Sequence, residues 1–150
     1  MIKTLAELES LKILVVEDDP ALLRLYEVVL GRWRMSPQIT MAESGAEALQ
    51  CIEHECPDLM LLDLNLPDVD GLGLLRRLRA DMRLRATTIV AVSGMSAAAV
   101  DKKGGLPPGV ILVTKPVQFV QLEALAMILE ETKGRGARPD FIADRFPFPA

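Results

Sequence analysis

Five residues of this sequence could together carry out phosphoryl chemistry, and each follows a short aliphatic run. Adjacent acids such as Glu17 and Asp18 repel each other and take up protons, unless a cation or a helix amino terminus offsets their charge. A magnesium ion held by oxygen ligands is such a cation. A third acid could act as a carboxylate nucleophile, while a hydroxyl and an ammonium group bind the oxygens of a transferred phosphoryl group. The five residues are Glu17, Asp18, Asp63, Ser93 and Lys115.

Each of these residues also has a purely structural explanation. Ser93 could be a turn hydroxyl, Lys115 a surface charge and the acids helix caps. For the neighbouring Asp19 the structural explanation is the better one, because it precedes a proline, the favoured first residue of a helix. The coincidence of all five residues at strand ends is what favours chemistry.

The elements that must position these residues alternate along the chain. Strands are predicted at 12–16, 37–42, 59–62, 88–92 and 110–113, and helices at 21–30, 44–55, 72–82, 97–100 and 118–131. A capping box of Ser44 and Glu47 opens the second helix, and Met82 belongs to the apolar side of the third. This alternation predicts an α/β fold with a doubly wound, five-stranded parallel sheet and helices on both faces. Right-handed crossovers bring the carboxyl ends of all strands to one edge, where ligands bind in open α/β sheets.

Composition limits the class of protein. The chain has 150 residues, half of them hydrophobic, which is typical of one domain with a full core. A formal charge of -4 argues against a protein that coats nucleic acid, and the first residues lack the apolar run of a signal peptide. No segment reaches membrane-spanning length, so we expect a cytoplasmic protein. Cys51 and Cys56 are predicted to be reduced, and the single histidine, His54, to be a surface residue.

Four segments resemble the signature of the response-regulator receiver domain. They are residues 15–20 (VVEDDP), 62–67 (LDLNLP) with Gly71, 92–94 (VSG) and 114–116 (TKP). Together they span about residues 11–131, and their mutual spacings also fit the family. The resemblance implies a flavodoxin-like fold with the strand order 2-1-3-4-5.

The resemblance also implies how the acids would be used. Asp63 would accept a phosphoryl group from a phosphohistidine on a sensor histidine kinase or a histidine phosphotransfer protein. Asp18, Asp63 and the backbone carbonyl of Asn65 would bind Mg²⁺, and Glu17 would do so through water. The domain would catalyse only its own phosphorylation and dephosphorylation, so it would not be an enzyme in the ordinary sense.

The remaining signature residues would form the switch. Lys115 would pair with the phosphoryl oxygens, Ser93 with Gly94 beside it would bind them and move, and the peptide bond before Pro116 would be cis. Phosphorylation would bias a two-state surface formed by the fourth helix, the fifth strand and the last helix. The family usually has an aromatic switch residue three positions before the lysine, and here that position is Leu112.

We predict a receiver domain over residues 1–133 and a tail of Pro, Gly and Phe residues over 134–150, without an effector domain. The output would be binding to a downstream target protein, with no direct DNA contact and no membrane contact. The last helix has more apolar residues than one buried stripe needs, which a wide core contact or a homodimer through this helix would explain.

Three other functions compete with a phosphorylation-switched binding module. A phosphorelay carrier would pass the phosphoryl group to a histidine phosphotransfer protein, which the missing aromatic residue at Leu112 favours. A scaffold that acts without phosphorylation would leave the acid, hydroxyl and lysine set unexplained. A magnesium-dependent phosphohydrolase would need a general acid near its nucleophile, where this sequence has Asn65.

Overall fold

The computed structural model describes residues 10–133, which form a five-stranded parallel sheet in the order β2-β1-β3-β4-β5. The predicted fold class and strand order are confirmed. The expected tail over 134–150 lies outside the described residues. The strands are β1 (Lys12–Val16), β2 (Gln38–Ala42), β3 (Leu59–Asp63), β4 (Thr88–Ser93) and β5 (Ile111–Thr114).

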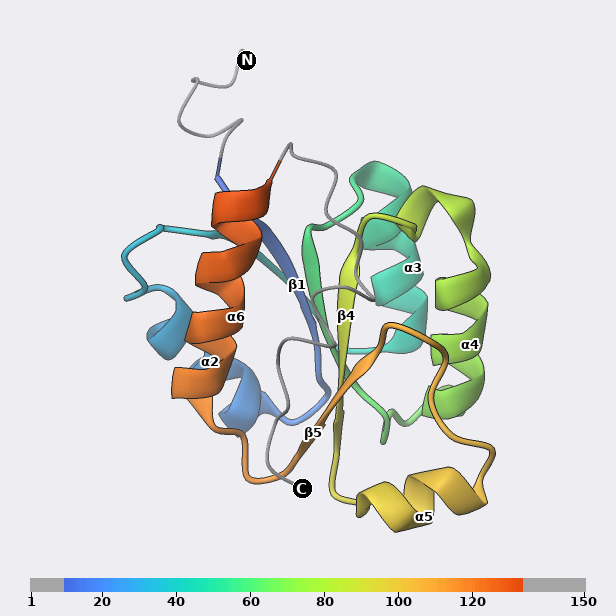
Figure 1. The fold of residues 1–150 in the computed structure, drawn as a ribbon. Helices are drawn as coiled ribbons and strands as arrows, with labels where there is room; N and C mark the ends of the chain where they lie inside the picture. The colour runs from blue at the N-terminus through green and yellow to red at the C-terminus, as the bar shows by residue number, and fades with distance from the viewer. Residues whose placement is uncertain (1–9, 134–150) are drawn as a thin grey trace.

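Helices cover both faces of the sheet (Figure 1). Helices α2 and α6 lie on one face, and α3 and α4 lie on the other, while the short α5 follows β4 at the carboxyl edge. No helix of the described chain is long and apolar enough to cross a membrane. The helices are α2 (Pro20–Leu30), α3 (Gly45–His54), α4 (Gly71–Ala80), the 3₁₀ turn η1 (Met82–Leu84), α5 (Ala97–Lys102) and α6 (Phe119–Thr132).

Two hydrophobic cores hold the layers together, because alternate residues of a strand point to opposite faces. Ile13 and Val15 of β1 pack with residues of α2 and α6, whereas Leu14 and Val16 pack with residues of α3 and α4. The central β3 is buried at every position. Strands buried on both faces explain the continuous aliphatic runs of the sequence.

Side-chain caps fix where the first two helices begin. Asp19 caps α2 by accepting a hydrogen bond from the N–H of Ala21 at 3.0 Å, as predicted. Ser44 caps α3 by accepting one from the N–H of Glu47 at 3.1 Å. The carboxylate of Glu47 binds the N–H of Glu43 at 2.8 Å, one residue before the cap. The expected reciprocal pair is therefore shifted by one residue.

Helix α4 ends earlier than its sequence pattern predicts. It stops at Ala80, because Asp81 has extended backbone angles and its side chain accepts a hydrogen bond from the N–H of Arg83 at 2.9 Å. Met82, which helical spacing places on the apolar side of α4, is instead 72% exposed in the 3₁₀ turn that follows. The prediction that Met82 lies on the apolar side of this helix is wrong.

The last helix has both a buried and an exposed apolar side. Leu122, Leu125, Ala126 and Leu129 are buried against the sheet. Phe119 at its start makes an edge-on contact with Tyr26 of α2, with ring centroids 5.4 Å apart. On the outer side, Val120 and Met127 are 81% and 50% exposed. Core packing thus accounts for one side of α6 and leaves the other to solvent.

Candidate functional site

The pairing of β1 with β3 brings together acids that lie far apart in the sequence. The two strands are parallel neighbours, with Val16 opposite Leu62. The next residues, Glu17 and Asp18 directly after β1 and Asp63 at the end of β3, therefore lie side by side at the carboxyl edge of the sheet. The register of β1 against β3 therefore brings the three acids together.

The three acids are close enough to bind one cation. One carboxylate oxygen from each of Glu17, Asp18 and Asp63 lies within 4.8 Å of the other two. Glu17 and Asp63 are almost completely buried, at 2% and 3% exposure, whereas Asp18 is exposed. Carboxylate oxygens are the ligands that Mg²⁺ and Ca²⁺ prefer, and an open side leaves room for water or substrate. The donor set therefore fits the expected magnesium ion.

Both carboxylate oxygens of Asp63 have protein donors. Oδ1 accepts a hydrogen bond from the N–H of Asn65 at 2.8 Å, and Oδ2 accepts one from Nζ of Lys115 at 3.0 Å. The same ammonium group lies 3.4 Å from Oε1 of Glu17. Lys115 thus joins the ends of β1, β3 and β5 at the acid cluster.

The charge balance of the cluster changes the pKa of two groups. Burial raises the pKa of Glu17 to about 7, and the contact with Asp63 adds to this rise. The backbone N–H groups of Asp18 and Asp19, at 2.8 and 3.1 Å from Oε2, favour the ionised form and only partly offset it. Burial lowers the pKa of Lys115, but the hydrogen bond and charge of Asp63 outweigh this, so its net pKa is raised. When ionised, the three carboxylates outnumber the one ammonium group by two charges, which a divalent metal ion would balance.

Ser93 and Gly94 form the adjoining wall of the crevice. Ser93 ends β4 and is buried, and its carbonyl accepts a hydrogen bond from the N–H of Lys115 at 2.8 Å. Its hydroxyl accepts one from the N–H of Met95 at 2.9 Å. Gly94 is exposed, and a Cβ at this position would have no atom within 4 Å. Access to the crevice from this side is open.

The loop from residue 64 to residue 70 carries Asn65 and lies beside a cavity of about 370 Å³. Gly71, which ends the loop, packs directly on it, since a Cβ there would lie 2.0 Å from the carbonyl oxygen of Leu64. A glycine is therefore required where the sequence signature has one. The cavity is lined by Leu64, Asn65, Leu66, Val69, Asp70, Gly71, Leu72, Ser93, Gly94, Met95 and Lys103.

Leu112 and Pro116 lie on either side of Lys115. The peptide bond between Lys115 and Pro116 is cis. Leu112 is half-buried in β5. Like Met95 and Val110, it packs against the hydrophobic core between the sheet and helices α3 and α4. An aliphatic side chain thus occupies the position at which the family resemblance led us to expect an aromatic ring.

Sequence reasoning missed one residue of the site region, Asp68. Its two carboxylate oxygens accept hydrogen bonds from the N–H groups of Gly45 and Ala46 at 3.0 and 3.1 Å. These partners lie 23 and 22 residues before Asp68, so no local sequence pattern predicts the contact. Only the packing of the loop against α3 reveals it.

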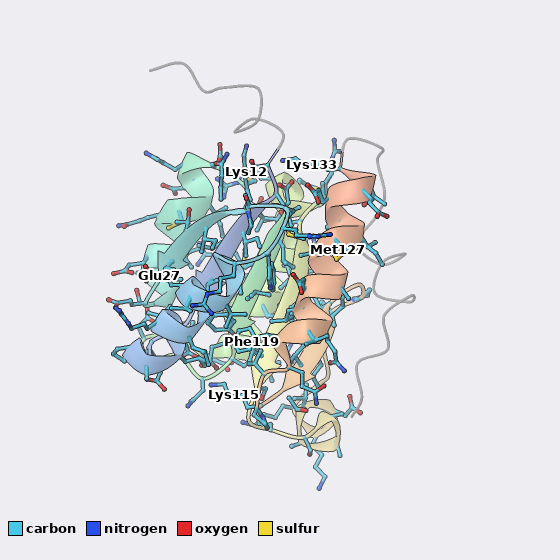
Figure 2. The ribbon with its side chains drawn as sticks, turned by 90° about the vertical axis from the view of Figure 1, so that its left-hand side faces the viewer. Lys12, Glu27, Lys115, Phe119, Met127 and Lys133 are labelled. Atoms are coloured by element: carbon cyan, nitrogen blue, oxygen red, sulfur yellow. The ribbon has the colours of Figure 1, made fainter. Side chains whose placement is uncertain are left out.

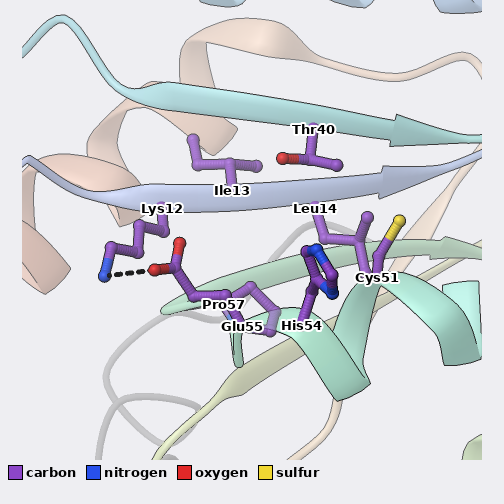
Figure 3. A pocket seen from close by; sticks show the side chains of 8 residues that line it. All are labelled: Lys12, Ile13, Leu14, Thr40, Cys51, His54, Glu55 and Pro57. Atoms are coloured by element: carbon purple, nitrogen blue, oxygen red, sulfur yellow. Dashed lines mark ion pairs between the residues drawn. The ribbon is translucent and has the colours of Figure 1, made fainter. Parts of the chain in front are cut away.

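A second cavity, of about 220 Å³, lies between β1, β2 and α3 (Figure 3). Lys12 and Glu55 form an ion pair of 3.2 Å at its border. His54 lines it at the exposed end of α3, which agrees with the prediction of a surface residue. Figure 2 shows Lys12 at the end of the molecule opposite Lys115. This cavity is therefore separate from the acid cluster.

The comparisons with known proteins agree with this geometry. A profile of the response regulator receiver domain matches residues 13–127. The transcriptional regulatory protein TrcR of Mycobacterium tuberculosis is 32% identical over 122 residues, which cover 79% of this chain and 45% of TrcR. The chain thus spans less than half the length of this relative.

Two solved structures share the fold of this chain and about a quarter of its aligned residues. A CheY-like receiver domain from Methylobacillus flagellatus superposes with a TM-score of 0.63 and 27% identity, over 80% of this chain and 98% of that domain. The phosphorylated cyanobacterial phytochrome response regulator RcpA gives a TM-score of 0.64 and 26% identity, over 87% and 99% of the two chains.

Proposed function

This chain belongs to the response regulator receiver domain family of two-component systems, and from that premise we propose that it accepts a phosphoryl group on Asp63 and thereby switches protein binding. The observation that carries the proposal is the contact of Lys115 with Asp63 beside the acid cluster. The donor would be a phosphohistidine on a sensor histidine kinase or on a histidine phosphotransfer protein, and the reaction would take place in the cytoplasm.

Asp63 supplies the nucleophile. One of its carboxylate oxygens attacks the phosphorus, a P–O bond forms, the P–N bond breaks, and the histidine nitrogen keeps the electron pair. The N–H of Asn65 and the ammonium of Lys115 orient the carboxylate before the attack. After transfer, Lys115 and the Ser93 hydroxyl, with Gly94 leaving the approach open, are placed to bind the phosphoryl oxygens.

Magnesium would be held by Asp18, Asp63 and the backbone carbonyl of Asn65, with Glu17 binding through water. When bound, it supplies screening of the negative phosphoryl oxygens. The buried acids support this assignment, because two of the three carboxylates lie out of solvent with one lysine to balance them. The domain changes only its own phosphorylation state and turns over no metabolite.

The output surface would be formed by α5, β5 and α6. Ser93 is hydrogen-bonded to the N–H of Met95, at the start of the segment leading into α5, so its movement toward a phosphoryl group would disturb that segment. Val120 and Met127 give α6 an exposed apolar side suited to a target protein or a second copy of this chain. We assign no direct DNA contact to residues 10–133.

A phosphorelay carrier is the second candidate, and Leu112 is the observation that favours it. Without an aromatic ring at this position, a smaller conformational change on phosphorylation is expected. A carrier needs to pass the phosphoryl group on more than it needs to change shape. Return of the group from Asp63 to the histidine of a phosphotransfer protein would distinguish it from a terminal switch.

The test is the intact mass of the protein after incubation with acetyl phosphate, with and without magnesium. We expect the gain of one phosphoryl group only when magnesium is present. Asp63→Asn should abolish this gain. Asp58→Asn is its matched control, because Asp58 precedes the same strand at the opposite edge of the sheet and should not affect the gain. A mass that stays constant in every condition would refute the proposed chemistry.

A further inference from the structure

The position of Asn65 depends on a loop, unlike that of the other proposed magnesium ligands. Asp63 is the last residue of β3, and Glu17 and Asp18 directly follow β1, its neighbour in the sheet. Asn65 lies in the segment 64–70, between β3 and α4, and it would offer its backbone carbonyl. A backbone ligand is positioned only as well as the loop that carries it.

On one side, this loop is bound to the first turn of α3. Asp68 accepts hydrogen bonds from the N–H groups of Gly45 (3.0 Å) and Ala46 (3.1 Å), one with each carboxylate oxygen. Val69 packs on the same turn so closely that a Cβ at Gly45 would lie 2.7 Å from its Cγ2 atom. The loop and the start of α3 therefore form one contact surface.

The chemistry of this contact makes it strong for a surface interaction. The first N–H groups of a helix lack partners within the helix, and the helix dipole favours a negative charge at this end. A carboxylate that binds two such groups forms charge-assisted hydrogen bonds. The hydrogen bond from Gly45 is the main cause that lowers the pKa of Asp68, so the carboxylate is ionised at neutral pH.

On its other side, the loop borders the cavity of about 370 Å³. Asp70, at the cap position of α4, forms no side-chain hydrogen bond to that helix. Leu64 and Leu66 are buried and hold the base of the loop. In the outer half of the loop, Asp68 thus provides the side-chain hydrogen bonds that attach the loop to α3. The cavity on the other side leaves space into which the loop could move.

We propose that Asp68 is a positioning residue for the phosphoryl chemistry: by binding the start of α3 it holds the 64–70 loop where the backbone of Asn65 can serve Mg²⁺ and Asp63. This inference rests on the proposed function, because the site that Asp68 would hold in place is the proposed site of phosphoryl transfer. Asp68 acts through Asn65 and touches neither the metal nor the phosphoryl group.

The experiment compares magnesium binding by the full chain with Asp68→Ala and Ser44→Ala. Both substitutions remove a cap from α3, but only Asp68 belongs to the loop. We expect Asp68→Ala to raise the magnesium dissociation constant about tenfold, the size typical for residues that orient metal ligands. Ser44→Ala should leave it unchanged. Calorimetric titration with magnesium alone measures this without any phosphoryl donor.

A second readout separates positioning from general destabilisation. The rate of phosphorylation by acetyl phosphate should fall in Asp68→Ala at low magnesium and recover at saturating magnesium. Asp68→Asn, which keeps one acceptor oxygen, should give an intermediate magnesium dissociation constant, and it allows the test if the alanine variant does not fold.

Two results would overturn the inference. One is an unchanged magnesium dissociation constant in both Asp68 variants, and the other is an equal increase in Ser44→Ala. A different result would refute the proposed function, namely that the wild-type protein gains no phosphoryl group. In that case the calorimetric comparison of magnesium binding still tests the role of Asp68. A wild-type chain that binds no magnesium would refute both.

Discussion

The ammonium group of Lys115 lies 3.0 Å from Oδ2 of Asp63, although the two residues are 52 positions apart in the sequence. It also lies 3.4 Å from Oε1 of Glu17, 98 positions away. One cation thus serves two buried acids that belong to different strands. The three acids of the cluster still exceed the single positive charge that this lysine provides.

Lys115→Ala should impair both the stability and the chemistry of the site. Without the ammonium group, Glu17 and Asp63 face each other without a cation, which destabilises the metal-free protein at neutral pH. The rate of phosphoryl transfer should fall about 100-fold or more, the usual effect of removing a donor to transferred oxygens. Single-turnover phosphorylation by acetyl phosphate and urea unfolding measure the two effects. Thr114→Ala, at the half-buried preceding position, is the control. Wild-type transfer rates in Lys115→Ala would show that the contact has no catalytic role.

Magnesium affinity should increase with pH up to about 7, the raised pKa of Glu17 in the metal-free protein. A cation favours the ionised acid, so magnesium binding below this pH must release a proton. The same shift has the opposite sign for folding. The folded state keeps a proton that the unfolded chain loses near 4.5, so the free energy of unfolding of the metal-free protein falls as the pH rises from 4.5 to about 7.

Magnesium titrations on both sides of pH 7 measure this dependence. In Glu17→Gln, which cannot ionise, the affinity should be nearly constant over the same range. An affinity of the wild-type protein that does not change with pH, or that falls as the pH rises, would contradict the assignment.

Two glycines of α4 should respond in opposite ways to alanine. Gly71→Ala should destabilise the protein by about 2 to 3 kcal/mol, because the new Cβ would overlap the backbone of Leu64 and force it to move. Gly73 is exposed, and its nearest neighbour is the side chain of Asp70 at 3.2 Å. The Asp70 side chain is exposed and makes no cap hydrogen bond, so it can move aside, and Gly73→Ala should stabilise the helix by about 0.5 to 1 kcal/mol. Urea unfolding of both variants measures these changes in the free energy of unfolding. Equal changes in the two variants would mean that the backbone of Leu64 moves away from residue 71 at little cost.

The outer side of α6 should mediate protein contacts without contributing to the core. Met127→Glu should change the free energy of unfolding by less than about 0.5 kcal/mol, since this side chain is half-exposed. Leu125→Ala, on the buried side, should cost about 2 to 5 kcal/mol. If a second copy binds there, sedimentation velocity will show that Met127→Glu weakens self-association. Unfolding of Met127→Glu as severe as that of Leu125→Ala would place Met127 in the core.

The sequence predicts the acid cluster well because the physical signals are local. Aliphatic runs that end in Glu17, Asp18 and Asp63 indicate buried strands with acids at one end. Parallel pairing of these strands then brings the acids together at one edge of the sheet. The strand order itself came from the resemblance to a family, since periodicity does not specify which strands are neighbours.

Other features could not be predicted because they depend on contacts distant in sequence or on competing local bonds. Asp68 binds N–H groups more than 20 positions earlier, and nothing near it signals the contact. Met82 fits the apolar spacing of α4, but the hydrogen bond that Asp81 accepts from Arg83 ends the helix first. The carboxylate of Glu47 was expected to bind Ser44 and binds Glu43 instead.

The most direct measurement is to locate the phosphoryl group after magnesium-dependent reaction with acetyl phosphate. Reduction with borohydride converts an aspartyl phosphate to homoserine, and peptide mass spectrometry identifies the converted residue. We predict conversion at Asp63 alone, and none in Asp63→Asn or without magnesium. Conversion at Asp18 or at another acid, or a phosphoryl gain that persists in Asp63→Asn, would contradict the account.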